Sequence, residues 1–353
     1  MAEYDAFLLV SFGGPEGPDD VMPFLQNVTR GRGIPPERLE AVAEHYYAAG
    51  GVSPINQQCR DLIAAIGKDF ATAGVDLPIY WGNRNWDPYL TATVAEMAAA
   101  GVRRALAFVT SAYGSYSGCR QYLDDIDRAR AQAGPGAPVI DKIRHFYQHP
   151  GFIEPFADAT VAAIGSLAPG IRADVPLVFT AHSVPDAMAA ASGPPPGGRY
   201  PSQLAEASGL IAERVNAATG GGHPWRLVYQ SRSGPPSQPW LGPDVGDYLE
   251  DLARDGAPGA VLVPVGFISD HMEVVHDLDV EAAETARRLG LPLARAGTPS
   301  TDPRFVSMIT ALVTERLKGQ VSLAALGSPG CGTGDCCRLP AAAGRPGPRP
   351  AAS

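Results

Sequence analysis

The sequence predicts an α/β protein made of two similar Rossmann-like domains, each with a doubly wound, parallel four-stranded sheet. Short β-rich apolar runs alternate with longer stretches of helical periodicity, which is typical of parallel strands covered by helices on both faces. The 353 residues suffice for two domains of ordinary size, and 45% hydrophobic with 18% charged residues is typical of a globular protein. We expect the two domains to face one another across a cleft.

Apolar runs in both halves of the chain are predicted to form the strands. The first half has runs at 6–12, 78–81 and 105–110, and the second half has runs at 176–181, 226–230 and 260–265, with a weaker candidate around Leu293. Alternating glycine and proline at 134–138 predicts a loop. The two halves are similar in pattern only, since no residue-level repeat is visible.

The last strong helix has clear start and stop signals. Asp302 is a good N-cap, Pro303 occupies the first helical position, and Gly319 ends an apolar stripe of helical spacing. Beyond Gly319 the composition shifts to alanine, glycine, proline and serine. We therefore expect five segments: an N-terminal α/β domain (1–165), a C-terminal α/β domain (166–300), a helix packing back on the body (301–319), a cysteine-bearing extension (320–340) and a disordered tail (341–353).

The charge and hydropathy of the chain exclude two classes of partner. The net charge of −9 repels phosphate backbones, and no basic stripe with interleaved aromatic residues is present, so we expect no nucleic-acid partner. No apolar stretch reaches the roughly 18 residues of a membrane helix, and the N-terminus does not resemble a signal peptide. We expect a cytoplasmic protein without stable membrane insertion. No self-complementary apolar stripe stands out, so we also expect a monomer.

Two residues are the strongest candidates for catalysis. His182 and, about ninety residues later, Glu273 each lie just past an apolar run that is predicted to be a buried strand. In open α/β proteins ligands bind beyond the carboxyl ends of the strands, so the two side chains can face each other across one cleft. A neutral imidazole with an ordinary pKa of about 6.5 suits a proton acceptor. The alternative for His182 is a structural histidine held by a backbone carbonyl group.

Glu273 begins a row of carboxylates. Glu273, Asp277 and Glu281 are spaced at i, i+4 and i+8, which places them on one face of a helix. Such a row allows a hydrated divalent cation to exchange water for carboxylate oxygen stepwise, and the alternative is an ordinary solvated face. Four further residues surround the row and can contribute or simply cap and pair locally: Asp270, His271, His276 and Asp279.

The cysteines are distributed unevenly. Cys331, Cys336 and Cys337 fall within seven residues near the end of the chain, whereas Cys59 and Cys119 lie far away. In a reducing cytoplasm this clustering favours metal binding over disulfide formation.

Several segments together resemble the ferrochelatases, which insert iron into a porphyrin. His182 lies in the sequence TAHSVP and Glu273 in VGFISDHME, both of which resemble conserved contexts of that family. Further similar segments are LLVSFGGP at 8–15, GGVSPI at 50–55, and QS at 230–231 followed by PWLGPD at 239–244. The matches occur in order from residue 6 to about 318. The resemblance implies a chelatase-like fold and an enzyme, a lyase of haem biosynthesis, whose substrates are a porphyrin and Fe2+.

The resemblance also implies a role for each matching residue. His182 matches the histidine that faces the macrocycle as base and iron ligand, and Glu273 matches the carboxylate beside it. Asp277 and Glu281 match the acidic row of metal ligands that leads inward. Three residues match porphyrin contacts: Ser53 and Tyr122 at the ring, and Ser231 near a propionate.

Two residues close to the N-terminus are further candidates for substrate binding. Arg30 is well placed to meet a carboxylate, because a guanidinium group pairs with it bidentately. The alternative, for Arg30 and equally for Arg32, is an exposed loop arginine. Glu16 stands where several bacterial relatives have a tyrosine that approaches the metal; its carboxylate can take that role or cap the helix that starts near Pro18. His276 stands where relatives often have an aromatic residue.

The polarity of residues 26–33 favours one porphyrin over another. Membrane-associated relatives have a longer, apolar lip in this region, whereas this chain has the short polar sequence QNVTRGRG. A polar lip suits coproporphyrin III, which has four propionates, better than protoporphyrin IX, which has two. The alternatives are a protoporphyrin IX ferrochelatase, a cobalt or nickel chelatase of the same fold, and a non-catalytic tetrapyrrole carrier.

The resemblance implies a [2Fe-2S] cluster as cofactor, because some relatives pair a body cysteine with three in a C-terminal extension. The expected ligands are Cys119, Cys331, Cys336 and Cys337, with Cys59 as the alternative to Cys119. Adjacent Cys336 and Cys337 are an unusual ligand spacing, so the alternative is that one of them is not a ligand. A zinc site with the same ligands and a non-ligating tail are the other interpretations.

Overall fold

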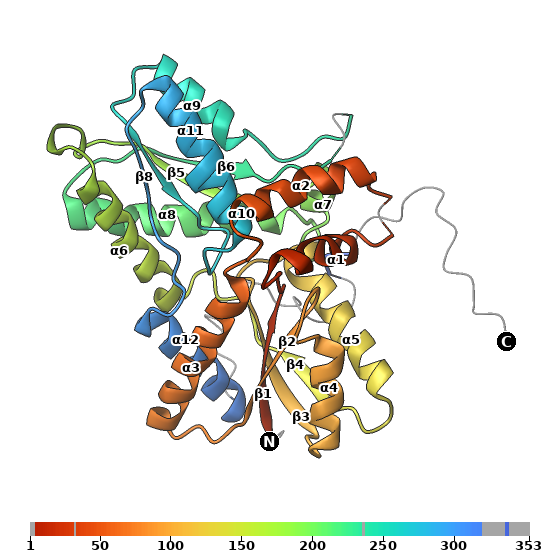
Figure 1. The fold of residues 1–353 in the computed structure, drawn as a ribbon. Helices are drawn as coiled ribbons and strands as arrows, with labels where there is room; N and C mark the ends of the chain where they lie inside the picture. Colours follow the sequence, from red (N-terminus) through yellow and green to blue (C-terminus); the bar gives the residue numbers. More distant parts are fainter. Residues whose placement is uncertain (1–3, 32, 235–236, 320–335, 339–353) are drawn as a thin grey trace.

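Two parallel four-stranded sheets form the framework of the molecule, as the sequence predicts (Figure 1). The structure is a computed structural model that describes residues 4–31, 33–234, 237–319 and 336–338, so Arg32, Cys331 and the predicted tail at 341–353 lie outside the described residues. The first sheet has the order β2-β1-β3-β4 and the second β6-β5-β7-β8. The strands are β1 (Ala6–Ser11), β2 (Ile79–Asn83), β3 (Arg104–Val109), β4 (Val139–Lys142), β5 (Leu177–His182), β6 (Trp225–Gln230), β7 (Ala260–Val263) and β8 (Leu293–Arg295).

Strand β4 is missing from the runs that the sequence predicts, and its position in the sheet explains why. It pairs in parallel with β3 at the edge of the first sheet, so one of its sides has no neighbouring strand. Its residues are exposed or half-buried, and two of them, Asp141 and Lys142, are charged. Strands with both faces buried have continuous apolar runs, whereas a partly exposed edge strand does not.

Helices cover both faces of each sheet, so the central strands are buried on two sides. Apolar side chains of α3 and α12 pack on one face of the first sheet and those of α4 and α5 on the other, while α6 and α8 oppose α9, η3 and α11 on the second sheet. The helices are α1 (Pro18–Val28), α2 (Pro36–Ala48), α3 (Ile55–Ala73), α4 (Leu90–Ala99), η1 (Tyr116–Arg120), α5 (Gln121–Ala133), α6 (Pro150–Ser166), η2 (Pro169–Ile171), α7 (Asp186–Ala190), α8 (Arg199–Thr219), α9 (Val245–Arg254), α10 (Met272–Val274), η3 (Val275–Ala282), α11 (Ala283–Leu289) and α12 (Pro303–Leu317). No described helix combines the length and apolar character needed to cross a bilayer.

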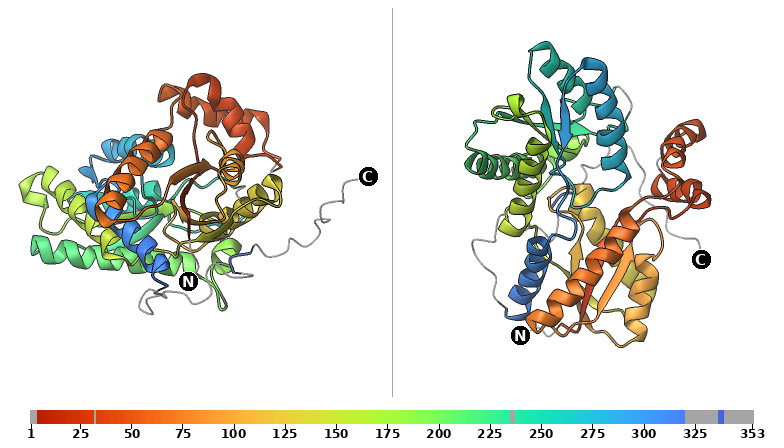
Figure 2. Two further views of the ribbon diagram at one scale, coloured as in Figure 1. Left: turned by 90° about the horizontal axis from the view of Figure 1, so that it is seen from below. Right: turned by 60° about the vertical axis from the view of Figure 1, so that its left-hand side comes forward.

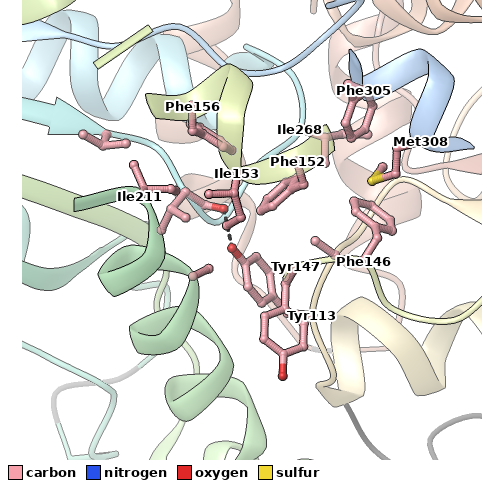
Figure 3. Packing of buried hydrophobic residues seen from close by; sticks show 14 of the residues in the cluster. Tyr113, Phe146, Tyr147, Phe152, Ile153, Phe156, Ile211, Ile268, Phe305 and Met308 are labelled. Atoms are coloured by element: carbon pink, nitrogen blue, oxygen red, sulfur yellow. Dashed lines mark hydrogen bonds between the residues drawn. The ribbon is translucent and has the colours of Figure 1, made fainter. Parts of the chain in front are cut away.

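One continuous apolar core joins the two sheets. It contains Phe7 of β1 together with Phe179 of β5, both completely buried. Between the sheets the Tyr113 hydroxyl donates a hydrogen bond of 2.8 Å to the carbonyl oxygen of Val265, and aromatic rings pack around it (Figure 3). The two halves are therefore held in a fixed arrangement by buried contacts rather than by a linker alone.

Helix α12 strengthens this arrangement from the far end of the chain. Its start agrees with the prediction, since the Asp302 carboxylate accepts a hydrogen bond from the Arg304 N–H at 2.9 Å. The helix packs against α3 of the first half and against α6, so it lies beside the first sheet although it follows the second in sequence (Figures 1 and 2).

Phe305 of α12 provides a test of this shared core. The side chain is completely buried, with its ring 5.9 Å from that of Phe146 and 6.3 Å from that of Phe108. Replacement by alanine removes these contacts and leaves a cavity, so Phe305→Ala should lower the free energy of unfolding by about 3 to 5 kcal/mol in urea denaturation. Phe305→Leu, which keeps most of the apolar volume, should lower it less. Equal stability of wild type and Phe305→Ala would show that α12 is not part of the core.

Candidate active site

His182 is the last residue of β5, and its hydrogen bonds determine which ring nitrogen is basic. Its Nδ1 lies 2.5 Å from the carbonyl oxygen of Ser183. A carbonyl oxygen can only accept, so Nδ1 must hold the proton and Nε2 has the free lone pair. The backbone is also held, because the Tyr200 hydroxyl donates to the His182 carbonyl oxygen at 2.8 Å. Burial, with further contributions from Tyr229 and Glu273, raises the pKa of Tyr200, which therefore stays a donor.

Glu273 lies opposite the basic nitrogen. Its Oε1 is 3.9 Å from His182 Nε2, and the two side chains are 42% and 35% exposed, so both open to solvent rather than into separate interiors. Two contacts fix the Glu273 backbone at the start of α10. Its N–H donates to His271 Nδ1 at 3.1 Å, and its carbonyl oxygen accepts from Gln230 Nε2 at 3.0 Å. Burial lowers the pKa of His271, which is consistent with a neutral ring that accepts this N–H.

The row of carboxylates continues along a π-helix, where the sequence predicts a regular helix. Helix α10 has three residues and is followed by η3, a π-helix, before α11 begins. Asp277 lies within η3, and its Oδ2 accepts hydrogen bonds from the Ser231 hydroxyl and, at 3.2 Å, from Gln230 Nε2. Burial raises the pKa of Asp277 to about 6, and the nearby carboxylates of Glu273 and Glu281 add to the rise. π-Helices often mark functional sites.

His276 belongs to this group, although the sequence gives it less weight than the carboxylates. Its Nδ1 lies 3.8 Å from Asp277 Oδ1 and 3.8 Å from Glu281 Oε1. One ligand atom from each of the three residues lies within 4.8 Å of the others, which is close enough for a single metal ion. The three residues are spaced at i, i+1 and i+5. A π-helix brings residues i and i+5 onto the same side, whereas the α-helix expected from the sequence separates them, so the sequence pattern does not reveal this cluster.

Helices of the first half complete the surroundings of the row. Gln58 of α3 donates to the Asp270 carbonyl oxygen at 3.0 Å. His45 of α2 stacks its ring on that of His276, with 3.8 Å between the ring centroids. Tyr46, the next residue, is near Glu273 and Asp277, since burial and then these two carboxylates raise its pKa. The sequence contains no local signal for Tyr46 or His45, because their proximity to the row depends on long-range contacts.

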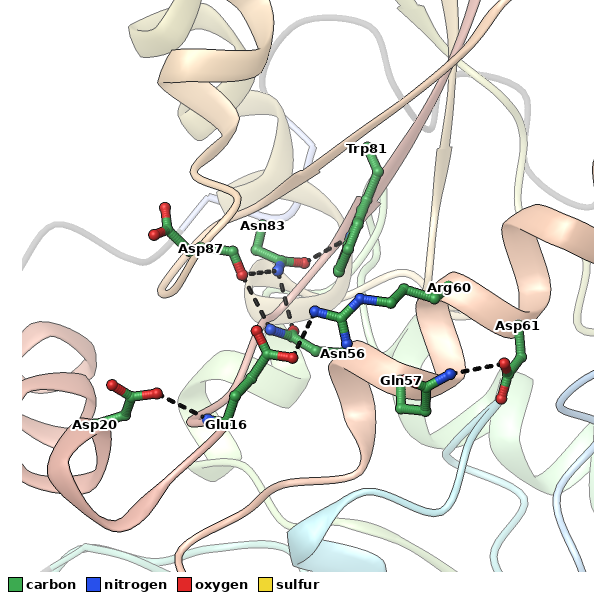
Figure 4. A network of polar contacts seen from close by, with 9 residues as sticks. All are labelled: Glu16, Asp20, Asn56, Gln57, Arg60, Asp61, Trp81, Asn83 and Asp87. Carbon is green, nitrogen blue, oxygen red and sulfur yellow. Dashed lines mark hydrogen bonds and ion pairs between the residues drawn. The ribbon is translucent and has the colours of Figure 1, made fainter.

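Ser53 and Glu16 lie together where β1 leads into α1. Ser53 is buried, and its N–H donates to the Pro15 carbonyl oxygen at 2.8 Å. A Cβ atom on Gly14 would approach Ser53 Cβ to 2.7 Å, so this position requires glycine. The Glu16 carboxylate forms an ion pair of 2.5 Å with Arg60 Nη2, within a wider polar network (Figure 4). Glu16 is thus engaged by an arginine, and its backbone N–H donates to the Asp20 carboxylate at 3.0 Å.

Tyr122 and Arg30 differ strongly in their exposure. Tyr122 is buried between the first sheet and α5, and the guanidinium of Arg84 lies 4.4 Å from the centre of its ring. Arg84 in turn pairs with Asp125 at 2.5 Å. Arg30 is exposed just beyond α1. The structure therefore brings together His182, Glu273, Ser231, Asp277 and Glu281 on the second half, while Ser53, Tyr122, Arg30 and Glu16 belong to the first half.

The described cysteines lie in two environments. Cys119 is completely buried in η1, next to His145, whose pKa is lowered by burial. The sulfur of Cys337 accepts a hydrogen bond of 3.0 Å from the Gly193 N–H, and Cys336 interacts electrostatically with Arg120, the neighbour of Cys119. Cys59 lies elsewhere, in α3, where burial raises the pKa of its thiol to about 11.

Solved structures with a similar fold include chelatases. The chelatase SirB from Bacillus subtilis, solved with Fe3+, superposes with a TM-score of 0.53 over 90% of this chain and 98% of SirB. The sirohydrochlorin chelatase SirB solved with cobalt gives a TM-score of 0.51 over 90% of this chain and 97% of its own. The identities are 11% and 10%, so the likeness concerns the fold alone.

The relatives in sequence are much closer. The coproporphyrin III ferrochelatase of Streptomyces griseus is 51% identical over 98% of both chains, and that of Frankia alni is 58% identical over 88% of this chain and 79% of its own. The ferrochelatase of Rhodopirellula baltica is 51% identical over 98% of both chains. The model of the family described as Ferrochelatase matches residues 4–317. The chain therefore belongs to the ferrochelatase family.

Proposed function

We propose that this protein is a coproporphyrin III ferrochelatase, which inserts Fe2+ into coproporphyrin III to give Fe-coproporphyrin III in haem biosynthesis. Several relatives with about half of their residues identical and near-complete coverage have this name. The observation that carries the proposal is the His182 ring, whose Nδ1 is engaged by the Ser183 carbonyl oxygen and whose Nε2 lies 3.9 Å from the Glu273 carboxylate. The cytoplasmic location and monomeric state expected from the sequence remain predictions.

The pair of side chains suits the chemistry of porphyrin metallation. Insertion requires the loss of two pyrrole protons. His182 Nε2 accepts them one at a time, because Nδ1 is already protonated, and its exposed ring releases the first proton to solvent before it takes the second. The resulting imidazolium is stabilised by the negative charge of Glu273 beside it. The Glu273 carboxylate can also hold Fe2+ as a ligand, and His182 Nε2 can do so whenever it is not protonated, since imidazole nitrogen and carboxylate oxygen suit this ion. Asp277 and Glu281 extend the row of anionic ligands towards solvent.

The substrate-binding roles are proposed from the resemblance to the family. Arg30, exposed beside α1, is our candidate partner for a propionate, because a guanidinium group binds a carboxylate bidentately. Ser53 and Tyr122 are assigned to the porphyrin ring on the side of the first half, and Ser231 to a propionate near Asp277. Glu16 can approach the substrate only if its ion pair with Arg60 opens.

Replacement of His182 tests the proposed mechanism. Without the imidazole no group accepts the pyrrole protons, so His182→Ala should lower the rate of Fe2+ insertion into coproporphyrin III by about 100-fold or more. The variant should still bind the porphyrin, because the proposed contacts with the porphyrin ring are made by other residues, Ser53 and Tyr122. Insertion is measured anaerobically by the absorption change of the porphyrin, and binding by fluorescence quenching.

The wild-type protein provides the control for function and substrate. Insertion should be faster with coproporphyrin III than with protoporphyrin IX, and equal or reversed rates would support the protoporphyrin enzyme instead. Faster insertion of cobalt or nickel than of iron would support a different chelatase. Binding without any insertion by the wild type would support the carrier. Unchanged insertion by His182→Ala would remove this residue from the mechanism.

The raised pKa of Asp277 has a consequence for stability. Its pKa is about 6 in the folded protein against an ordinary value of 3.8, because the carboxylate is buried near two others. Below about pH 4 the group is protonated in both the folded and the unfolded chain, so its ionisation contributes nothing. As the pH rises through 6 the folded chain binds more protons than the unfolded chain, and the free energy of unfolding falls. The ionised carboxylate thus costs stability at neutral pH, and a bound cation would offset this cost.

Asp277→Asn should remove that cost. At about pH 7.5 the variant should be more stable than wild type by up to about 3 kcal/mol, at about 1.4 kcal/mol per pKa unit, and the difference should shrink towards zero near pH 4. The measurement is urea denaturation of metal-free protein at both pH values. Asp279→Asn is the matched control: it removes the ion pair with Arg295 and should not stabilise the protein at pH 7.5. A gain for Asp277→Asn that is the same at both pH values would contradict the raised pKa.

We further propose that the C-terminal cysteines hold a [2Fe-2S] cluster, with Cys119, Cys331, Cys336 and Cys337 as ligands. Such clusters require thiolates, and hydrogen bonds to their sulfurs tune them. Three of the four proposed ligands lie among the described residues, and their surroundings fit this chemistry. Cys119 is buried, the Cys337 sulfur accepts a hydrogen bond from the Gly193 N–H, and Cys336 interacts electrostatically with Arg120, the neighbour of Cys119. The cluster would tether the end of the chain to the first half.

Cys119→Ser tests the choice of the body ligand. The full-length protein, purified anaerobically, should be brown and contain about two irons per chain, whereas Cys119→Ser should lose the colour and the iron. The measurements are visible absorption and analysis of iron and sulfide. Cys59→Ala is the matched control and should keep both. Loss of the colour and the iron in Cys59→Ala but not in Cys119→Ser would identify Cys59 as the fourth ligand. A colourless wild-type protein that contains zinc would show that the cysteines bind zinc instead of a cluster.

A further inference from the structure

Arg60 of α3 is an exposed arginine that the proposed mechanism does not use. Its Nη2 lies 2.5 Å from Glu16 Oε1, and the two side chains are 44% and 39% exposed (Figure 4). Exposed ion pairs add little to the stability of a fold, because water and salt screen their charges. The surroundings of the pair indicate a role in binding instead.

A rigid platform holds the Arg60 guanidinium. The guanidinium lies 5.6 Å from the centre of the Trp81 ring, and the Trp81 indole N–H donates to Asn83 Oδ1 at 2.9 Å. Asn83 and Asn56 are completely buried, and both donate to the Asp87 carbonyl oxygen at 3.0 Å. The Arg60 charge therefore rests on an aromatic ring whose own orientation is fixed by buried amide groups.

Glu16 lies next to a residue that is assigned to the porphyrin ring. Its backbone forms an isolated antiparallel bridge with Val52, the neighbour of Ser53, and its N–H donates to the Asp20 carboxylate at 3.0 Å. These bonds fix the backbone, whereas the side chain is exposed. Without Arg60 the Glu16 carboxylate would be an unpaired negative charge beside the proposed porphyrin contact.

Further charges of the first half lie close to Glu16. Burial raises the pKa of Tyr89, and the Asp87 carboxylate adds to the rise. Arg30 opposes the rise and Asp20 strengthens it, so these charged groups lie around one phenol. Arg30, our candidate partner for a propionate, is therefore surrounded by carboxylates, and one of them, Asp20, is bonded to the Glu16 backbone.

The charge of the substrate makes this region decisive for binding. The chain has a net charge of −9 and coproporphyrin III has four propionates, so an unpaired carboxylate at the site would repel the substrate. We propose that Arg60 is a specificity-determining residue, which neutralises Glu16 and so allows a porphyrin with several carboxylates to bind beside Ser53. The role rests on the proposed function for the choice of substrate, but porphyrin binding is measured without iron.

Removal of the Arg60 charge tests this role. At about 20 mM salt Arg60→Gln should raise the Kd for coproporphyrin III about tenfold, and the increase should shrink at about 0.5 M salt, because ions screen exposed charges. The increase should be smaller for protoporphyrin IX, which has two propionates. Arg60→Lys keeps the charge and should bind almost as well as wild type. The measurement is fluorescence quenching of the porphyrin by the full-length protein.

The matched control is Arg288→Gln. It removes an arginine from another exposed ion pair, with Glu250 at 2.8 Å, and should leave the Kd for coproporphyrin III unchanged. Thermal unfolding should be nearly the same for wild type, Arg60→Gln and Arg288→Gln, since both pairs are exposed.

The same change in a Glu16→Gln background separates neutralisation from direct binding. There Arg60→Gln should alter the Kd less than about twofold, because no charge is left for Arg60 to neutralise. A tenfold increase in this background as well would show that Arg60 binds the porphyrin itself, and would overturn the proposal. An equal Kd for wild type and Arg60→Gln, or an increase that does not depend on salt, would also overturn it.

Iron insertion distinguishes this role from the proposed function. A wild type that binds coproporphyrin III in the expected charge-dependent way but inserts no iron would overturn the proposed function and leave the role of Arg60 standing. A wild type that inserts iron, with an Arg60→Gln variant that binds the porphyrin equally well, would have the opposite meaning. A wild type that does not bind coproporphyrin III would overturn both.

Discussion

The continuous apolar core that joins the two sheets is the constraint on which the site depends. Phe7 and Phe179 belong to one buried cluster, and the bond from Tyr113 to the Val265 carbonyl group crosses between the halves. Closely packed interiors do not deform continuously, so the ends of β5 and β7 stay fixed relative to those of the first sheet. The core therefore holds the His182–Glu273 pair of the second half in a fixed position relative to Ser53 and Tyr122, the proposed ring contacts of the first half.

The metal-binding row is the place where local stability is reduced. Three carboxylates lie close together, one of them buried with a raised pKa, and the helix that holds them has π-helical hydrogen bonds over eight residues. The crowded carboxylates disfavour one another's ionisation and favour a nearby cation, and π-helices are frequent at functional sites. The surrounding core supplies the stability that this segment lacks.

The region around α1 and α2 has a different physical character. These helices have a small core of their own, which includes Val21, Phe24, Leu25 and Ala43, and Figure 2 shows them to one side of the sheets. Their link to the second half passes through the stacked rings of His45 and His276 and the proximity of Tyr46 to Glu273. The same segment contains Arg30, so it connects the proposed substrate contact with the metal-binding row.

The sequence by itself determined the fold class, the buried strands, the capped last helix and the family. Continuous apolar runs, capping residues and helical periodicity are local sequence patterns. They identify β1, β5 and α12 without any knowledge of the elements that pack against them. His182 and Glu273 could also be singled out, because both follow strands whose carboxyl ends meet in this class of fold.

Only the tertiary structure decided the remainder. Strand β4 owes its place to its neighbour β3, the π-helix η3 overrides the α-helical spacing of its sequence, and Glu16 pairs with an arginine forty-four residues away. His45 joins His276 from the other half of the chain. These features arise from contacts between residues far apart in sequence, and local patterns contain no information about which distant side chains will meet.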